Sequence, residues 1–285
     1  MKKRKIWAGL SSAVLVAAPA VAQATALPVQ PQAGIEAKAD RALLHLAQHQ
    51  GHAAPAATAG GEGEGGEGGG AAQLPPPIHV YRGVEMIRGH LLVGAELIEA
   101  GRWADALPHF LHPEEEIYGS IRDQLKTFNI APFQAALKSL SQTVKAKNKE
   151  AYARARAVID ERLAAAETAV RAKEENGTYF VLETALEVLQ QAADEYEEAV
   201  EKGRIANVVE YQDARGFVME VDRLVGTVAQ AASAKNADAV KALQASLADL
   251  KATFPAVTPP KQAVKDTSQF LSDVSKFELQ LGNFH

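Results

Sequence analysis

The chain of 285 residues contains no cysteine. This absence excludes disulfide frameworks, thiolate metal sites, cysteine nucleophiles and lipoprotein anchoring at a cysteine. Aromatic residues make up only 6% of the chain while hydrophobic residues make up 47%, which is typical of a folded, alanine-rich helical protein. A basic excess is lacking too, because the formal net charge is −5. We therefore predict no nucleic-acid partner.

Recognisable catalytic motifs are missing as well. The sequence has no H-E-x-x-H, no Glu-x-x-His pair of the di-iron carboxylate bundles, no G-x-S-x-G and no phosphate-binding loop. A G-x-G-x-x-G match begins at Gly61, but no strand precedes it. We therefore predict a protein that is not an enzyme, with no catalytic residues and no organic cofactor.

Residues 1–24 have the organisation of a secretory signal peptide. Residues 2–5 are all cationic, an apolar run covers residues 6–18, and small residues in an A-x-A pattern end at Ala24. The run is short for a bilayer span, and no later segment offers eighteen uncharged apolar residues, so we predict no membrane span in the mature chain. An uncleaved anchor is the alternative. Without an Arg-Arg pair, the Sec pathway to the periplasm or the exterior is favoured, and the mature chain would carry a charge of about −9.

A histidine-bearing leader, partly helical, is predicted for residues 25–50. Its extension to His52 places His45, His49 and His52 at i, i+4 and i+7, a spacing with which imidazoles can chelate a divalent ion. The alternative is a weakly ordered leader with incidental histidines. Residues 51–77 contain GGEGEGGEGGG and three consecutive prolines, which predict a flexible linker.

From Val80 onward the hydrophobic periodicity is helical. We predict an all-α fold of antiparallel helical bundles, with the first bundle over 80–175 and the second, with a C-terminal clamp helix, over 178–285. The expected helices are 80–100, 103–111, 114–128, 131–146, 149–175, 178–202, 205–233, 236–253 and 261–281.

An internal duplication is one interpretation of this region. The corner at residues 98–107 resembles residues 200–209, and the segment that begins AKN at Ala146 resembles the one that begins AKN at Ala234. Chance similarity between helical sequences is the alternative, and the sequence leaves both open.

The candidate metal ligands gather at the first bend of the helical region. Two histidines and two glutamates there are separated by three or four residues, so a continuous helix would turn them to one face, and a histidine of the preceding helix could approach across the bend. These ligands would suit iron, zinc or copper. The candidates are His90, His109, His112, Glu115 and Glu116.

A structural interpretation competes with this one. Pro113 suits the first turn of a new helix, whose positive end the following three glutamates would stabilise. His112 would then only precede the helix, and Glu114 would lie nearer the buried stripe than Glu115 or Glu116.

The same bend resembles the first two helices of a tetratricopeptide repeat, with small residues at Gly94 and Ala106 where the helices would approach closely. The pattern does not recur at a spacing of 34 residues, so we expect a single hairpin and no repeat array.

A secreted, cysteine-free, all-helical chain with a possible duplication resembles the imelysin group of periplasmic iron-associated proteins, which are paired helical bundles. The resemblance is architectural and covers about residues 80–281. The group's Gly-x-His-x-x-Glu signature is not matched, since His90 directly follows Gly89 and the next glutamate is Glu96. The resemblance implies a role near metal uptake or handling, and no site residue is transferred from it.

Together these patterns predict a periplasmic or secreted, non-enzymatic helical protein that binds or handles a transition metal. The leader would capture ions and deliver them to the bundle. The alternative is a structural or adaptor protein of the cell envelope that docks a partner through its helix faces and holds no metal.

Overall fold

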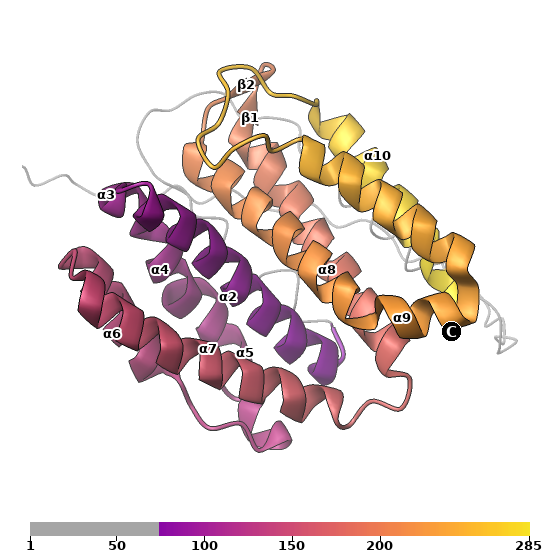
Figure 1. Ribbon diagram of the computed structural model, residues 1–285, viewed down its shortest axis with the longest axis horizontal. Coiled ribbons are helices and arrows are strands. Elements are labelled where there is room, and N and C mark those ends of the chain that lie inside the picture. Colours follow the sequence, from indigo (N-terminus) through magenta and orange to yellow (C-terminus); the bar gives the residue numbers. More distant parts are fainter. Residues whose placement is uncertain (1–73) are drawn as a thin grey trace, which may run out of the picture. The chain divides into compact units, whose positions relative to one another are not determined.

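The computed structural model describes residues 74–285, and this part of the chain is almost entirely helical (Figure 1). The predicted all-α class is therefore confirmed. The predicted signal peptide, the leader histidines and nearly all of the linker lie outside the described residues. None of the helices between residues 74 and 285 combines the length and the apolar composition that a bilayer crossing requires.

Most of the elements follow one another with short connections. In chain order they are α2 (Pro76–Glu99), α3 (Trp103–Ala106), α4 (Pro108–His112), the π-helix η2 (Pro113–Tyr118), α5 (Gly119–Ile121), the 3₁₀-helix η3 (Leu125–Phe128), α6 (Gln134–Lys145), α7 (Lys149–Arg171), α8 (Gly177–Ala199), β1 (Val200–Glu201), β2 (Arg204–Ile205), α9 (Val208–Ala252), α10 (Thr267–Glu278) and the 3₁₀-helix η4 (Leu281–Phe284). A longer connection, residues 253–266, joins α9 to α10.

Helix α2 is the central element of the described chain. Figure 1 shows it running between α6 and α7 on one side and α8 and α9 on the other. The apolar residues of this helix recur with a helical period, yet the structure buries nearly every side of it, including Glu85 and His90. Several helices pack around α2, as they do around a core helix.

Helix α9 accounts for two of the predicted helices. Its backbone departs from helical geometry at Asn236, where φ is −154° and ψ is 96°. The Asn236 side chain accepts a hydrogen bond from the backbone N–H of Ala239 and so caps the second segment. Asn148, in the other AKN sequence, caps α7 in the same way.

The two similar corners fold differently. Gly101, with a φ of 78°, follows the end of α2, whereas Lys202 and Gly203, both with positive φ, form the turn between β1 and β2. The sequence predicts helix up to residue 202, and this short hairpin corrects it. Two adjacent residues with positive φ are typical of a tight hairpin turn. The duplication stays a prediction.

Buried apolar side chains from Ile78 to Phe284 form one connected core. Helix α10 packs against α8 and α9, and it buries Phe270, Val274 and Phe277. The division into bundles at 80–175 and 178–285 stays a prediction.

Candidate metal centre

A close crossing of α2 and α9 positions the first two side chains of the site. A Cβ atom added to Gly216 would collide with the carbonyl oxygen of Gly89, and one added to Gly89 would lie 2.7 Å from the ring of Phe217. Glycine at both positions lets the two backbones touch. His90 follows Gly89 directly, and Asp213 lies one helical turn before Gly216, so the crossing brings both side chains to the same interface.

The bend after α2 supplies two more imidazoles. A second glycine contact helps here, because a Cβ atom on Gly94 would collide with the ring of Phe110. Small residues at this bend do therefore permit close packing, as the hairpin pattern predicts. Helix α4, which carries His109 and His112, consequently lies against α2.

The predicted break at Pro113 does not interrupt the helical run. His112 has φ −49° and ψ −43°, and Pro113 has φ −53° and ψ −36°, so the backbone stays helical into the π-helix η2. Proline has no N–H to donate into the preceding turn, and a widened π-turn is one way in which a helix accommodates such a loss. His112 and Glu116 thus keep helical spacing.

The three imidazoles surround one carboxylate. The Nδ1 atoms of His90 and His109 each lie 2.7 Å from Oδ1 of Asp213. Nδ1 of His112 lies 3.3 Å from Oδ2 of the same carboxylate. The side chains of His90, His109 and Asp213 are fully buried, whereas 18% of the His112 side chain is exposed. We call these four residues the histidine–aspartate cluster.

The two predicted glutamates have different positions. Oε1 of Glu116 lies 3.9 Å from Nε2 of His112, at the edge of the cluster. Glu115 is exposed, and within residues 74–285 no contact joins it to the histidines. Glu114 accepts a hydrogen bond from Gln134, and its predicted place nearest the buried stripe stays a prediction. In a helix that widens after Pro113, only the residue four positions after His112 returns to it.

Asp213 was missed from the sequence. It lies in the predicted helix over 205–233, four residues before the buried Phe217, so its position on an apolar stripe was the available signal.

Burial alone would raise the pKa of Asp213. The charges of His90 and His109, with hydrogen bonds from His109 and His112, instead hold the pKa of this carboxyl well below its usual range.

The pKa of His112, the partly exposed member of the cluster, is shifted as well. Burial by itself lowers the pKa of His112. The adjacent Asp213, with a smaller contribution from Glu116, outweighs this effect and raises the pKa of His112 above its ordinary value.

The buried part of the cluster has the composition of a transition-metal site. One ligand atom each from His90, His109 and Asp213 can be chosen so that all three lie within 4.8 Å of one another. Ions of this kind bind imidazole nitrogen and carboxylate oxygen at about 2.0–2.2 Å. Two imidazoles with one carboxylate suit iron, zinc, copper or nickel better than magnesium or calcium, which prefer oxygen ligands.

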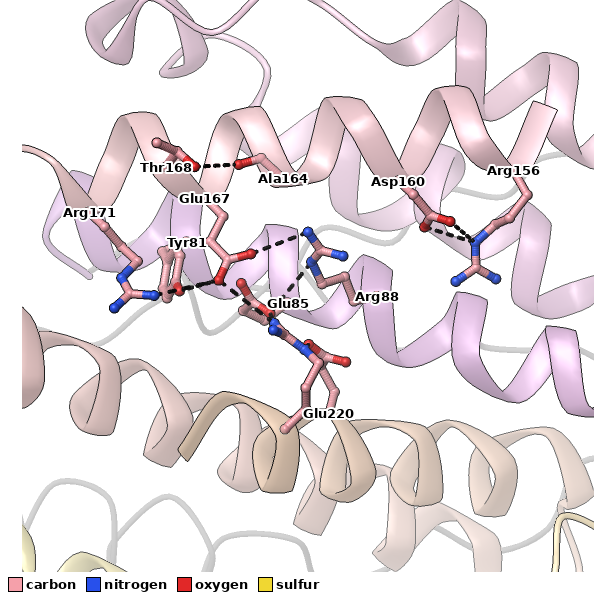
Figure 2. Close-up of polar contacts among 11 residues, drawn as sticks. Tyr81, Glu85, Arg88, Arg156, Asp160, Ala164, Glu167, Thr168, Arg171 and Glu220 are labelled. Carbon is pink, nitrogen blue, oxygen red and sulfur yellow. Dashed lines mark hydrogen bonds and ion pairs between the residues drawn. The ribbon is translucent and has the colours of Figure 1, made fainter. Parts of the chain in front are cut away.

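A second polar cluster lies where α2, α7 and α9 meet, and in it the carboxylates of Glu85 and Glu220 are buried (Figure 2). The Arg223 guanidinium lies 2.8 Å from Oε2 of Glu85 and donates to Oε1 of Glu220 at 2.5 Å. Arg88 donates to Oε2 of Glu167 at 3.2 Å. Burial and the neighbouring carboxylates raise the pKa of Glu85 well above its usual range. We call these five residues the glutamate–arginine cluster.

The comparison with protein families gives one match. Residues 171–284 match the family described as the iron permease-associated 4-helix bundle domain. No curated protein and no solved structure matches the chain. The matched region contains α8, the two segments of α9 on either side of Asn236, and α10, which together supply four helical segments.

This match indicates a helical bundle with a link to iron permeases. It includes Asp213 but stops short of the three histidines, which precede residue 171. The candidate metal centre therefore joins a carboxylate from the matched domain to imidazoles from the part of the chain before it.

Proposed function

We propose that this protein binds a divalent transition-metal ion, iron in its biological setting, and handles it for an iron permease. The observation that carries the proposal is the convergence of His90, His109 and Asp213 in a fully buried position. A buried carboxylate needs compensation by positive charge, and here its neighbours are imidazoles, which can also act as metal ligands.

Charge balance favours a divalent over a trivalent ion. Two neutral imidazoles and Asp213 present one negative charge, and Glu116 adds a second at the edge of the cluster. A divalent ion is neutralised by this set, whereas a trivalent ion would leave an uncompensated charge in a buried site. We therefore propose ferrous iron as the ion bound.

His112 and Glu116 lie on the route between this centre and solvent in our proposal. Their side chains are 18% and 14% exposed, whereas those of His90, His109 and Asp213 are fully buried. An ion would meet this pair first and then pass to His90, His109 and Asp213.

The setting of this activity comes from the sequence. We propose an exported, non-enzymatic protein, because the first 24 residues resemble a signal peptide and no nucleophile–base motif is recognisable. The imelysin resemblance belongs to the same proposal, since both it and the matched family concern iron.

An adaptor role without metal is the second candidate. The words "permease-associated" in the family description favour a membrane-protein partner, which helix faces of the bundle would contact. In this case the buried histidines would serve only to neutralise Asp213.

Metal loading distinguishes the two candidates. The full chain is dialysed against Fe²⁺ without oxygen, or against Zn²⁺, and bound metal is measured by mass spectrometry. We expect one ion per chain in the wild type and a loss of affinity of about 100-fold in His90→Leu. The matched control is His79→Leu, which changes another buried histidine of α2 and should leave loading unchanged. A folded wild-type chain that takes up neither ion overturns the metal-binding proposal and leaves the adaptor role.

A further inference from the structure

Gln212 lies beside the candidate metal centre and is 1% exposed. Its Nε2 atom donates to the carbonyl oxygen of Val257, at 3.0 Å, in the connection between α9 and α10. This hydrogen bond fixes the orientation of the amide, since only the nitrogen can donate to a carbonyl. Oε1 of Gln212 therefore faces Nε2 of His109, at 3.0 Å.

The orientation of Gln212 determines which nitrogen of His109 can bind a metal. Oε1 can only accept a hydrogen bond, so the hydrogen in this contact belongs to Nε2 of His109. A ring nitrogen that carries hydrogen has no lone pair for a metal. Coordination is left to Nδ1, which lies 2.7 Å from Oδ1 of Asp213 and would exchange its hydrogen bond to this carboxylate for the ion.

We propose that Gln212 is the positioning residue of this centre. It holds His109 in the tautomer with hydrogen on Nε2, so that the Nδ1 lone pair is directed at an ion shared with Asp213 and His90. Partners of this kind orient metal-binding histidines and increase their basicity. The inference rests on the proposed function and deepens it. In it the connection between α9 and α10, through Val257, sets the geometry of the candidate metal centre, whose ligands come from α2, α4 and α9.

The test measures Zn²⁺ affinity and the His109 tautomer in the full chain. Long-range ¹H–¹⁵N spectra of Zn²⁺-loaded wild type should show His109 with hydrogen on Nε2. Gln212→Leu removes the acceptor, and we expect about 10–100-fold weaker Zn²⁺ binding and loss of the single tautomer. Gln212→Glu keeps an acceptor oxygen and should keep the tautomer.

Two further variants separate positioning from a general loss of packing. Tyr211→Phe removes the neighbouring hydrogen bond to the same connection, from the Tyr211 hydroxyl to the carbonyl of Ala256, and should leave Zn²⁺ affinity unchanged. In a His109→Ala background, Gln212→Leu should have no additional effect, because Gln212 acts through His109.

The outcomes separate this inference from the proposed function. A folded wild-type chain that binds no Zn²⁺ overturns both. If the wild type binds Zn²⁺ with His109 protonated on Nδ1, only the role of Gln212 is overturned, and this result does not depend on any variant folding. The same holds if Gln212→Leu keeps both its affinity and its tautomer.

Discussion

Two polar clusters with buried carboxylates lie along the same pair of helices, α2 and α9, and differ in the cations that neutralise them. On α2, Glu85 of the glutamate–arginine cluster precedes His90 by five residues; on α9, Glu220 follows Asp213 by seven. In one cluster the carboxylates face guanidinium groups, and in the other a carboxylate faces imidazoles.

This difference decides which cluster can hold a metal. Arginine keeps its charge at every relevant pH and offers no lone pair, so Glu85 and Glu220 already have a permanent counter-ion. Histidine can be neutral and can bind a metal through nitrogen. Burial of acidic groups is therefore insufficient to identify a metal site, because the identity of the neighbouring cation matters as much.

Removal of one carboxylate charge from each cluster tests whether only the histidine–aspartate cluster binds metal, and it should give the largest difference. Asp213→Asn should weaken Zn²⁺ binding by about 100-fold, since it removes the buried anionic ligand of the centre. Glu220→Gln should leave Zn²⁺ affinity unchanged. Titration calorimetry measures both. Equal losses in the two variants would show that the clusters are not functionally distinct.

The next largest effect is expected on stability, from a substitution at the crossing of α2 and α9. Gly216→Ala places a methyl group against the Gly89 carbonyl, so we expect about 1–3 kcal/mol of destabilisation together with weaker metal binding. Gly226→Ala on the same helix meets nothing within 4 Å and should be neutral or stabilising by up to about 1 kcal/mol. Urea unfolding checks both, and a neutral Gly216→Ala would argue against a tight crossing.

The pH dependence of stability tests the second cluster. The pKa of Glu85 is raised on folding, so the folded chain binds this proton more tightly than the unfolded chain. Its contribution to stability is fully present below the unfolded pKa and is lost as pH rises through the folded pKa.

The neutral variant Glu85→Gln lacks that pH-dependent loss. Its stability relative to the wild type should therefore increase as pH rises from the unfolded pKa toward neutrality. Urea unfolding at a series of pH values measures this difference. A constant difference across the series would contradict the raised pKa.

The smallest effect concerns the leader. If its histidines deliver ions, deletion of residues 25–73 should slow metal uptake while the buried centre keeps its affinity. Stopped-flow uptake and equilibrium loading are compared for the full and shortened chains. Identical uptake rates would remove the leader from the proposed function.

Local patterns predict most of the helices and three of the four residues of the histidine–aspartate cluster, His90, His109 and His112. The period of apolar residues predicted the all-α class, and the four-residue spacing of His112 and Glu116 predicted their approach. The turn at Pro113 was harder, because a proline can either start a new helix or continue a run as a π-turn. Glu115, which the sequence groups with Glu116, is exposed, since one residue along a helix turns a side chain through about 100°.

The helical class of the described residues follows from local sequence, because hydrophobic periodicity and capping act over a few residues. Only the tertiary structure brought Asp213 to His90 and His109, which are 123 and 104 residues away along the chain. That meeting depends on two glycines on different helices that allow their backbones to touch, and no local pattern encodes which helix faces which. Tertiary packing likewise gave imidazole neighbours to Asp213 and guanidinium neighbours to Glu85 and Glu220.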